Sequence, residues 1–465
     1  MVGAIQARPL AAFSRPQSSF AQTRATLTHV PLPVALLLIS VLLPGELDFY
    51  LGTIRLSCQR LVLIAFLPSA FMRMIAGKDA SLRSFDVLFF CTFAYYVFAT
   101  FVKEPADKAV VTGGILFLEG MGGYLIARAY IRDKVQFLST VKLLFIIVLI
   151  LAAMAIPESM FFQHFVKNLA ARISGAPQWP PGESRLGLLR AMAVFDHPIH
   201  YGTFCASVFG LVWFTGAKLS NRLFRGGLVA AAAFFSLSAG PIQGIVFILM
   251  AALWERTTRQ VPHRVWLTVI LMSILYGFAA LLTNRPPIKI LITTFVLDSN
   301  SAWYRMLIWD YGFENVLDNP WFGVPLGTWV RPAWMPNDTI DNYWLVTAMW
   351  GGLPTVSLQI LSILALLRSA NRRPTTSEDP ERRASRYAWS ATILTMCLIG
   401  GTVHYWGALS IHFMFCLGMG GWLADRRFGR APSSRGRSVG PRVLPVESDS
   451  AFVTLAPAET IRAPR

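Results

Sequence analysis

The sequence predicts an all-α, polytopic membrane protein of about twelve transmembrane helices, and three observations lead to that prediction. Hydrophobic residues make up 54% of the 465 residues and charged residues only 14%, whereas a soluble protein of this length carries far more charge on its surface. The apolar residues fall into uncharged runs of roughly 15 to 25 residues, the length of helix that crosses the hydrocarbon core of a bilayer. Backbone polar groups in lipid must be satisfied within their own segment, so these runs are expected to be helices.

The candidate spans follow one another from near the start of the chain to near its end. They are expected at residues 30–46, 56–72, 84–102, 109–127, 138–156, 199–216, 226–239, 241–254, 264–282, 342–367, 387–402 and 404–423. No small-residue cleavage site follows the first apolar run, so it is expected to be an uncleaved span rather than a signal peptide. The membrane domain is therefore expected at residues 30–425. It lies between a cytoplasmic N-terminal tail, 1–29, and a disordered cytoplasmic tail, 426–465, that is rich in Pro, Ser and Arg.

The distribution of positive charge predicts which side of the membrane each connector faces. Lys and Arg lie in every second connector, at residues 73–83, 128–134, 218–225, 256–264 and 368–386. By the positive-inside rule these connectors and both termini are cytoplasmic. The two long connectors, 157–198 and 283–341, then lie on the periplasmic side, where chemistry is expected. The same placement explains the net charge of +17 better than nucleic-acid binding does, since no long basic and aromatic surface is present.

No cofactor or metal site is predicted. The five cysteines lie in or beside apolar runs and form no C-x-x-C pair, so they are expected to act as small apolar residues. His197 and His200 are three residues apart and would share a helix face, but no third ligand stands nearby at metal-binding spacing. Contact with a substrate, or packing at the membrane interface, is expected of these two histidines instead.

The first long connector ends in a helix start. Pro198 suits the first turn of a helix, and either Asp196 or His197 would cap it. Arg190 lies just before this junction.

The second long connector is rich in tryptophan. Seven of the fourteen tryptophans lie between residues 301 and 350. Such aromatics commonly form the belt at the membrane interface, but their density here favours a surface that stacks on sugar rings or covers a lipid carrier. Trp303 and Trp309 flank Arg305 on an expected short amphipathic helix. Arg305 is expected either to anchor a lipid headgroup or to make a bidentate contact with phosphate.

Asp341 marks the start of the tenth expected span and has two interpretations. As the N-cap of that helix it would be purely structural. As a carboxylate at a membrane-facing cleft it would act as a general base, although the positive end of the helix would favour its charged form and lower its basicity. The residue types alone leave both interpretations open. Asn342, beside it, is expected to contact the substrate together with His197, His200, Trp303 and Trp309.

Several of these motifs occur in a fixed order along the chain. They are Arg190, Phe195-Asp-His-Pro-Ile-His-Tyr-Gly202, Ser236-Leu-Ser-Ala-Gly-Pro241, Trp303-Tyr-Arg305-x₃-Trp309, Asn319-Pro-Trp-Phe-Gly323 and the junction at Asp341. In this order and topology, residues 80–425 resemble the O-antigen ligase and polysaccharide polymerase family of bacterial membrane proteins.

The chain departs from the family pattern at two positions. The ligase signature has a histidine, then Asn, Ser or Gln, nine residues, and Gly-x-x followed by Gly, Thr or Tyr. This chain reads Asp341-Asn342, nine residues and Gly352-Leu-Pro-Thr355, so an aspartate replaces the histidine. The second departure is Ala239, where an arginine often follows the Ser-x-Ser stretch.

The resemblance implies a glycosyltransferase of the bacterial inner membrane that uses a glycan on undecaprenyl diphosphate. An acceptor hydroxyl would attack the anomeric carbon with inversion, and the carrier diphosphate would leave. Arg190 and Arg305 match the family's arginines that stabilise the leaving group without a metal. Asp341 would be the base or would orient the acceptor. The missing histidine favours a polymerase of repeat units over a ligase onto lipid A core. Polysaccharide export and chain-length proteins are the candidate protein partners.

Two other classes of function also fit a chain with this number of spans. A transporter or flippase of lipid-linked glycans would bind its substrate near the bilayer midplane, between structural repeats. The sequence shows no repeat, and its charged residues avoid the centres of the spans. A non-catalytic assembly component is the other alternative.

Overall fold

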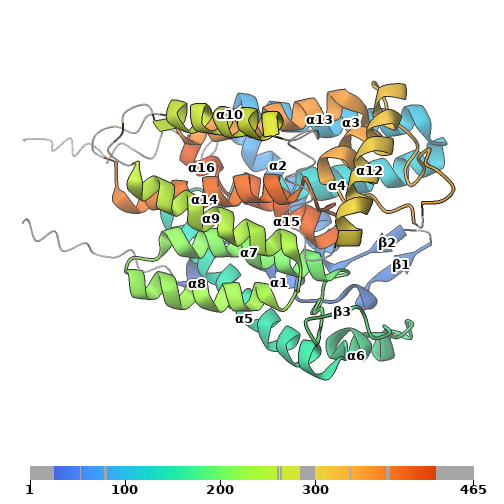
Figure 1. Ribbon diagram of the computed structural model, residues 1–465, viewed down its shortest axis with the longest axis horizontal. Helices are drawn as coiled ribbons and strands as arrows, with labels where there is room; N and C mark the ends of the chain where they lie inside the picture. Colours follow the sequence, from blue (N-terminus) through green and yellow to red (C-terminus); the bar gives the residue numbers. More distant parts are fainter. Residues whose placement is uncertain are drawn as a thin grey trace, which may run out of the picture. The chain divides into compact units, whose positions relative to one another are not determined.

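The computed structural model describes residues 26–425, except 53, 78–80, 259–260, 262–263, 283–298, 336 and 373–377. The expected C-terminal tail, 426–465, and nearly all of the expected N-terminal tail lie outside these residues. The helices are α1 (Leu32–Ser40), α2 (Cys58–Ala76), α3 (Ser84–Lys103), α4 (Ala106–Tyr130), α5 (Lys134–Phe161), α6 (Phe165–Ser174), α7 (Pro198–Thr215), α8 (Leu219–Phe234), α9 (Ala239–Thr257), α10 (Arg264–Leu282), α12 (Ser299–Asp318), α13 (Tyr343–Ala370), α14 (Pro380–Ile399), α15 (Gly407–Gly418) and α16 (Gly421–Ala424) (Figure 1).

Each segment that was predicted to span the membrane contains a helix. Within the described residues, six helical segments are both long and apolar enough to cross a membrane: α2, α3, α4, α5, α13 and the continuous stretch of α15 and α16. The protein is therefore a mostly helical membrane protein. The first predicted span, 30–46, was too long, because α1 ends at Ser40. Pro44 follows closely, and the residue before a proline is pushed out of the helical conformation.

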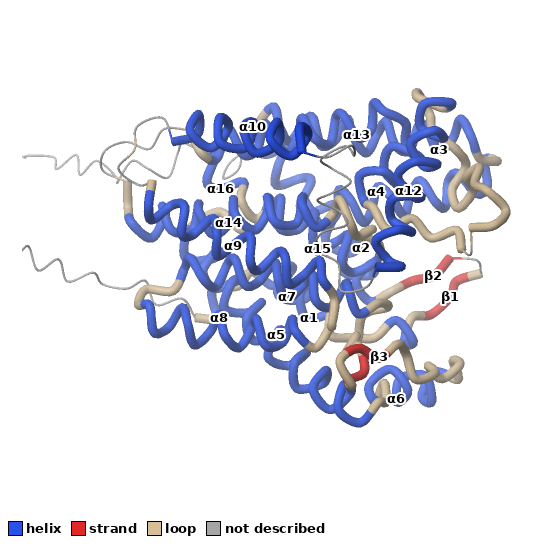
Figure 2. Tube along the Cα trace, in the orientation of Figure 1, coloured by secondary structure: helices blue, strands red, loops and turns tan. Residues whose placement is uncertain are grey.

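The fold is not purely helical, because two small antiparallel hairpins interrupt it. Strands β1 (Phe49–Leu51) and β2 (Ile54–Leu56) form the first, and β3 (Ser184–Arg185) and β4 (Leu188–Leu189) form the second (Figure 2). The long connectors also contain helices. Helix α6 lies in the first, and α12, whose 20 residues exceed the short helix that was expected around Arg305, lies in the second.

Helices distant in sequence pack side by side to form the core. Helix α13 packs along α3, α15 packs along α4, and α7 lies among α8, α9 and α14. Small residues allow the closest approach. A Cβ added to Gly123 of α4 would lie 2.7 Å from the carbonyl oxygen of Ile411 in α15. This is the small-residue packing that membrane helices use, since lipid gives them no hydrophobic reason to associate.

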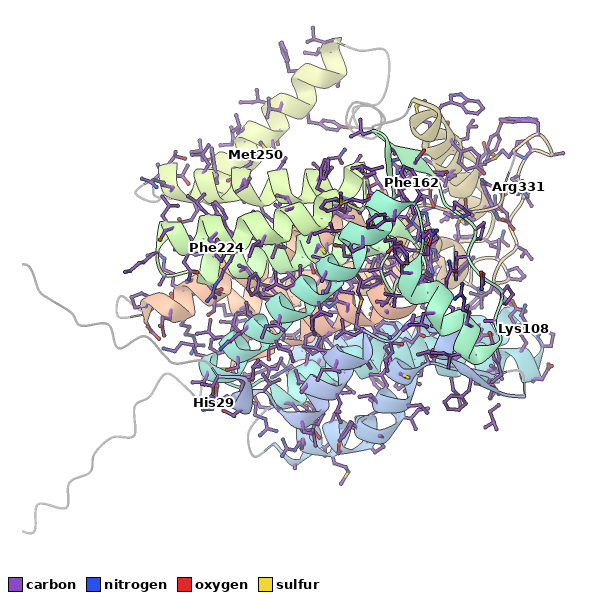
Figure 3. The ribbon with its side chains drawn as sticks, turned by 90° about the horizontal axis from the view of Figure 1, so that it is seen from below. His29, Lys108, Phe162, Phe224, Met250 and Arg331 are labelled. Atoms are coloured by element: carbon purple, nitrogen blue, oxygen red, sulfur yellow. The ribbon has the colours of Figure 1, made fainter. Side chains whose placement is uncertain are left out.

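The ends of the helices form two groups, which lie at opposite ends of the described part of the structure. The first group is the ion-pair end, where connectors predicted to be cytoplasmic are joined by charge. Arg128 binds Asp86 and Asp425 at 3.1 and 2.8 Å, and Lys134 binds Asp379 at 2.6 Å. Figure 3 shows Phe224 near this end and Phe162 near the other. The second group is the loop end, which carries the two hairpins, α6 and α12 (Figure 1).

Candidate active site

A cavity of about 750 Å³ opens at the loop end, where four connectors meet. Its walls come from residues 183–197, from the start of α9, from α12 with the chain that follows it, and from residues 402–406. The cavity brings together five of the predicted site residues: Arg190, His197, Trp303, Arg305 and Asp341. His200, Trp309 and Asn342 do not line it.

Arg190 is held in place by two partners on its guanidinium. Its Nη1 lies 2.8 Å from Glu183 Oε2, and its Nη2 donates to Ser238 Oγ at 3.0 Å. Ser238 belongs to the Ser-Leu-Ser stretch between α8 and α9, so this motif positions the arginine. The Nε of Arg190 is buried and has no hydrogen-bond partner in the described part of the chain. One donor of the fork is thus left for a ligand.

The backbone that follows Arg190 is held in place by the side chain of Glu158, which lies near the end of α5. The carboxylate of Glu158 accepts hydrogen bonds from the backbone N–H groups of Met192 and Ala193, at 2.9 and 2.8 Å, and lies 2.6 Å from His164 Nδ1. Ala193 has a φ of 51°, a left-handed conformation that a non-glycine residue adopts at a cost. These hydrogen bonds hold the turn that leads into α7.

Arg305 projects from α12 and makes no hydrogen bond or ion pair with any residue that the structure describes. Its Nε is buried and unpartnered. Burial lowers the pKa of Arg305, and the carboxylate of Asp341 opposes that effect. The guanidinium remains charged, because an arginine side chain stays protonated at any pH near neutrality. A half-buried cation with open donors suits the binding of an anion.

Asp341 is not the N-cap of α13, so this structural interpretation was wrong. Asn342 is the cap. Its Oδ1 accepts from the backbone N–H of Leu345 at 3.0 Å, and its Nδ2 donates to the carbonyl oxygen of Gly401 at 2.9 Å. Asn342 is buried, and both ends of its amide are occupied within the protein. Asn342 therefore has no free amide group with which to make the expected contact with a substrate.

The carboxylate of Asp341 is left free to face the cavity. It is exposed there, yet protein surrounds the site on its other sides. Loss of hydration raises the pKa of Asp341, while Arg305 and, to a smaller extent, Arg190 act to lower it. Both arginines therefore lie within electrostatic reach of this carboxylate. A raised pKa makes Asp341 a better proton acceptor than the helix-cap interpretation allowed.

A break in α13 lies close to the cavity wall. Gly352 has φ 75° and ψ 170° inside the helix, a combination that is essentially restricted to glycine. The Asn319–Gly323 turn fills the break. Val324 N–H donates to the carbonyl of Met349, and Leu353 N–H donates to that of Pro320, both at 2.7 Å. Trp350, just before the break, lines the cavity, and its Nε1 is buried without a partner in the described residues.

The two histidines of the first connector have different roles. His197 caps α7, because its Nδ1 accepts from the backbone N–H of Ile199 at 3.2 Å. Burial lowers the pKa of His197 to about 4, so its ring is neutral near pH 7. His200 is buried, with its Nε2 2.9 Å from the carbonyl oxygen of His404 and its ring centroid 3.8 Å from that of Trp406. It supports the wall rather than facing the cavity.

Several cavity residues were missed in the sequence. His404 and Trp406 lie in the connector between α14 and α15, which was taken for the meeting point of two spans. A histidine and a tryptophan beside Gly400-Gly401 were the available signal. Glu183 and Arg185 lie at the two-residue strand β3, which is too short to show a periodic pattern, so nothing in the sequence singled them out. Across the described residues, no three His, Cys, Asp or Glu side chains are grouped so as to hold a metal ion.

Comparison with known families gives one match. Residues 226–360 match the family model described as O-antigen ligase. The matched stretch contains Arg305, Asp341 and Gly352, whereas Arg190 and His197 lie before it and reach the same cavity through the fold. No curated protein matches the chain.

Proposed function

We propose, for a chain whose residues 226–360 match the O-antigen ligase family model, that this cavity transfers glycan from a lipid carrier diphosphate to an acceptor hydroxyl. The match to this family supports glycosyl transfer as the general type of reaction. The proposed donor is a repeat unit on undecaprenyl diphosphate, presented at the periplasmic face of the inner membrane. The proposed product is a longer glycan.

One observation carries the proposal. Two arginines with open donors, Arg190 and Arg305, share a cavity with a carboxylate, Asp341, that has no hydrogen-bond partner among the described residues. Arginine donors suit the charge that grows on a leaving diphosphate, and the guanidinium fork matches phosphate oxygens in pairs. A carboxylate accepts protons and hydrogen bonds only, so it suits an incoming hydroxyl.

The reaction balances with these groups alone. The acceptor oxygen forms a bond to the anomeric carbon, and the bond from that carbon to the diphosphate oxygen breaks. The electron pair of the broken bond leaves with the diphosphate, beside Arg190 and Arg305. The proton of the acceptor hydroxyl passes to Asp341. A single displacement of this kind inverts the anomeric configuration. Trp303 and Trp350 provide apolar walls around the sugar.

We favour polymerisation over ligation to lipid A core because Asp341 replaces the histidine of the ligase signature. Neutral His197 and buried His200 do not restore it, since neither follows the signature spacing. A carboxylate with a raised pKa can perform the same proton transfer. The acceptor is then the glycan of a second carrier-linked chain.

Purified protein incubated with undecaprenyl-diphosphate-linked repeat units tests this proposal. We expect carrier-linked chains of two or more repeats, separated by electrophoresis and identified by mass spectrometry. Glycan found only on added lipid A core would show a ligase. Movement of intact donor across proteoliposomes, without any new glycosidic bond, would show a transporter and refute the proposal.

The arginines give a second test. Arg190→Lys and Arg305→Lys keep the charge but lose the planar fork. We expect the transfer rate to fall by about 10² to 10³, the loss typical of removing one preorganised donor to a developing charge. Arg331→Lys is the matched control, because Arg331 follows α12, bonds the carbonyl of Met335 and does not line the cavity. Full activity in both cavity variants would contradict the proposed role.

A further inference from the structure

Two further cavities adjoin the candidate active site at the loop end. Their volumes are about 590 and 240 Å³, and they share Gly45, Arg55, Asp196 and Trp406 as walls. Trp406 also lines the 750 Å³ cavity, so one indole borders all three spaces. We refer to the pair as the Asp196 cavity. Nothing in the reaction proposed above uses it.

The carboxylate of Asp196 is free to face this cavity because Asp196 does not cap α7, just as Asp341 does not cap α13. The sequence left open whether Asp196 or His197 caps α7, and His197 is the cap. At α13 the same offset occurs, with Asn342 capping and Asp341 free. Each aspartate therefore lies one residue before its cap and lines a cavity. The Asp196 side chain is 39% exposed, and its nearest cation, Lys167 Nζ, lies 3.7 Å away.

The cations around the Asp196 cavity are already paired. Lys167 is fully buried, lies 3.2 Å from Glu46 Oε1, donates to the carbonyl of Phe195 at 3.0 Å and covers the ring of Trp179 at 3.9 Å. Arg55 binds Asp48 at 2.8 Å. Arg60 binds Glu119 at 2.8 Å on the wall of the smaller cavity. A phosphate here would also lie next to the carboxylates that line the same walls, which are Glu46, Asp48, Glu119 and Asp196.

Two carboxylates in the larger cavity have open hydrogen-bond acceptors. Glu46 lines the larger cavity with its side chain only 7% exposed, and its Oε2 has no hydrogen-bond partner in the described residues. Its other oxygen accepts from Trp179 Nε1 and is fixed by that bond. Asp196 adds a second carboxylate. A buried oxygen without a partner is costly, so its retention indicates a donor that arrives with a ligand.

Aromatic side chains complete the walls. Tyr50, Trp179 and Trp406 line the larger cavity. Aromatic faces offer apolar area for the C–H faces of a sugar, while carboxylates accept from its hydroxyls. A cation site is disfavoured by the geometry, because the described residues contain no metal-type grouping of His, Cys, Asp and Glu.

We propose that the Asp196 cavity is a carbohydrate subsite that binds a sugar of the acceptor glycan. The inference rests on the proposed glycosyl transfer, because it names where the second substrate of that reaction is held. Trp406, as the common wall, places a sugar in the Asp196 cavity next to the space that contains Asp341. The acceptor hydroxyl then reaches Asp341 while the neighbouring residue of the glycan stays bound to Asp196 and Glu46.

Binding is measured first, without turnover, by saturation-transfer NMR on the purified full chain. The probe is the repeat-unit oligosaccharide released from the surface polysaccharide of the host bacterium. Asp196→Asn and Tyr50→Ala are expected to weaken binding about tenfold or more, as loss of a charged hydrogen bond or a stacking face does. Tyr50 is 67% exposed, so its removal leaves folding intact.

Matched controls come from neighbouring positions. Phe49→Ala removes an exposed aromatic from the same strand that does not line the cavity, and Asp107→Asn removes an exposed carboxylate at the start of α4. Both should bind like the unmodified protein. Asp341→Asn should also bind, although it fails in transfer. In the transfer assay, Asp196→Asn should raise the KM for acceptor and leave the KM for donor unchanged.

Two results would overturn the subsite. One is unchanged oligosaccharide affinity in both Asp196→Asn and Tyr50→Ala. The other is displacement of the probe by inorganic phosphate or by phosphatidylglycerol vesicles, which would make the cavity a phosphate site. Failure of the transfer reaction itself gives a different pattern. The unmodified protein would then form no glycosidic bond, while the dependence of binding on Asp196 would remain.

Discussion

Replacing Asp341 by Asn separates the chemical role of this residue from any structural one. The amide keeps the shape of the side chain and cannot accept a proton. We expect the transfer rate to fall by about 10² to 10⁴, the usual contribution of a positioned general base. Asp318→Asn, an exposed carboxylate at the end of α12, is the control and should keep full activity.

The stability of this variant follows from the position of the cap. Because Asn342 caps α13, Asp341→Asn should not lower the free energy of unfolding. Loss of hydration inside the cavity raises the pKa of Asp341 above its ordinary value of 3.8. The charged carboxylate therefore lowers the free energy of unfolding. This loss grows as the pH rises from the pKa of Asp341 in the unfolded protein to its higher pKa in the folded protein. Asn removes that cost, so the variant should unfold at the same temperature or slightly higher. Asn342→Ala should lose about 0.5–2 kcal/mol instead.

The pH dependence of transfer gives an independent measurement. Activity needs the deprotonated carboxylate, so the rate should fall as the pH drops through the raised pKa of Asp341. Asp341→His, which restores the ligase-type residue, should retain function with this limb moved towards neutral pH. A fully active Asp341→Asn protein would refute the reasoning. The base would then have to be another group that lines the same cavity, such as His197 or His404.

Three further predictions follow from other parts of the structure. Gly352→Ala should lower the melting temperature in detergent, because its new Cβ would lie 1.9 Å from the carbonyl oxygen of Trp321, whereas Gly114→Ala, with open space around it, should not. His197→Gln should leave the transfer rate near pH 7 unchanged, since burial lowers the pKa of His197 to about 4 and the ring is already neutral at that pH. In a cysteine-free background, an impermeant thiol reagent applied to spheroplasts should label a cysteine at 337 and not one at 378. The reverse labelling would invert the predicted topology.

The sequence by itself determined the helical class and most helix positions. Spans such as 84–102 and 264–282 agree with α3 and α10 to within a residue or two, because a run of apolar residues without charge can only be a helix in lipid. It also led to three candidate site residues. Arg305 and Asp341 were chosen for their residue types and their places in the second long connector, and Arg190 was chosen through the family resemblance.

Tertiary structure decided which groups are free to act. Whether Asp341 or Asn342 caps α13 depends on backbone angles at one residue, and both residue types are good caps. Arg190 is held by Glu183, just before β3, and by Ser238, just before α9, and His404 and Trp406 come from a third connector. Apart from the contact with Glu183, these contacts join residues that lie far apart in the chain. Local propensity carries no information about such contacts, because they form only when the helices that carry them pack together.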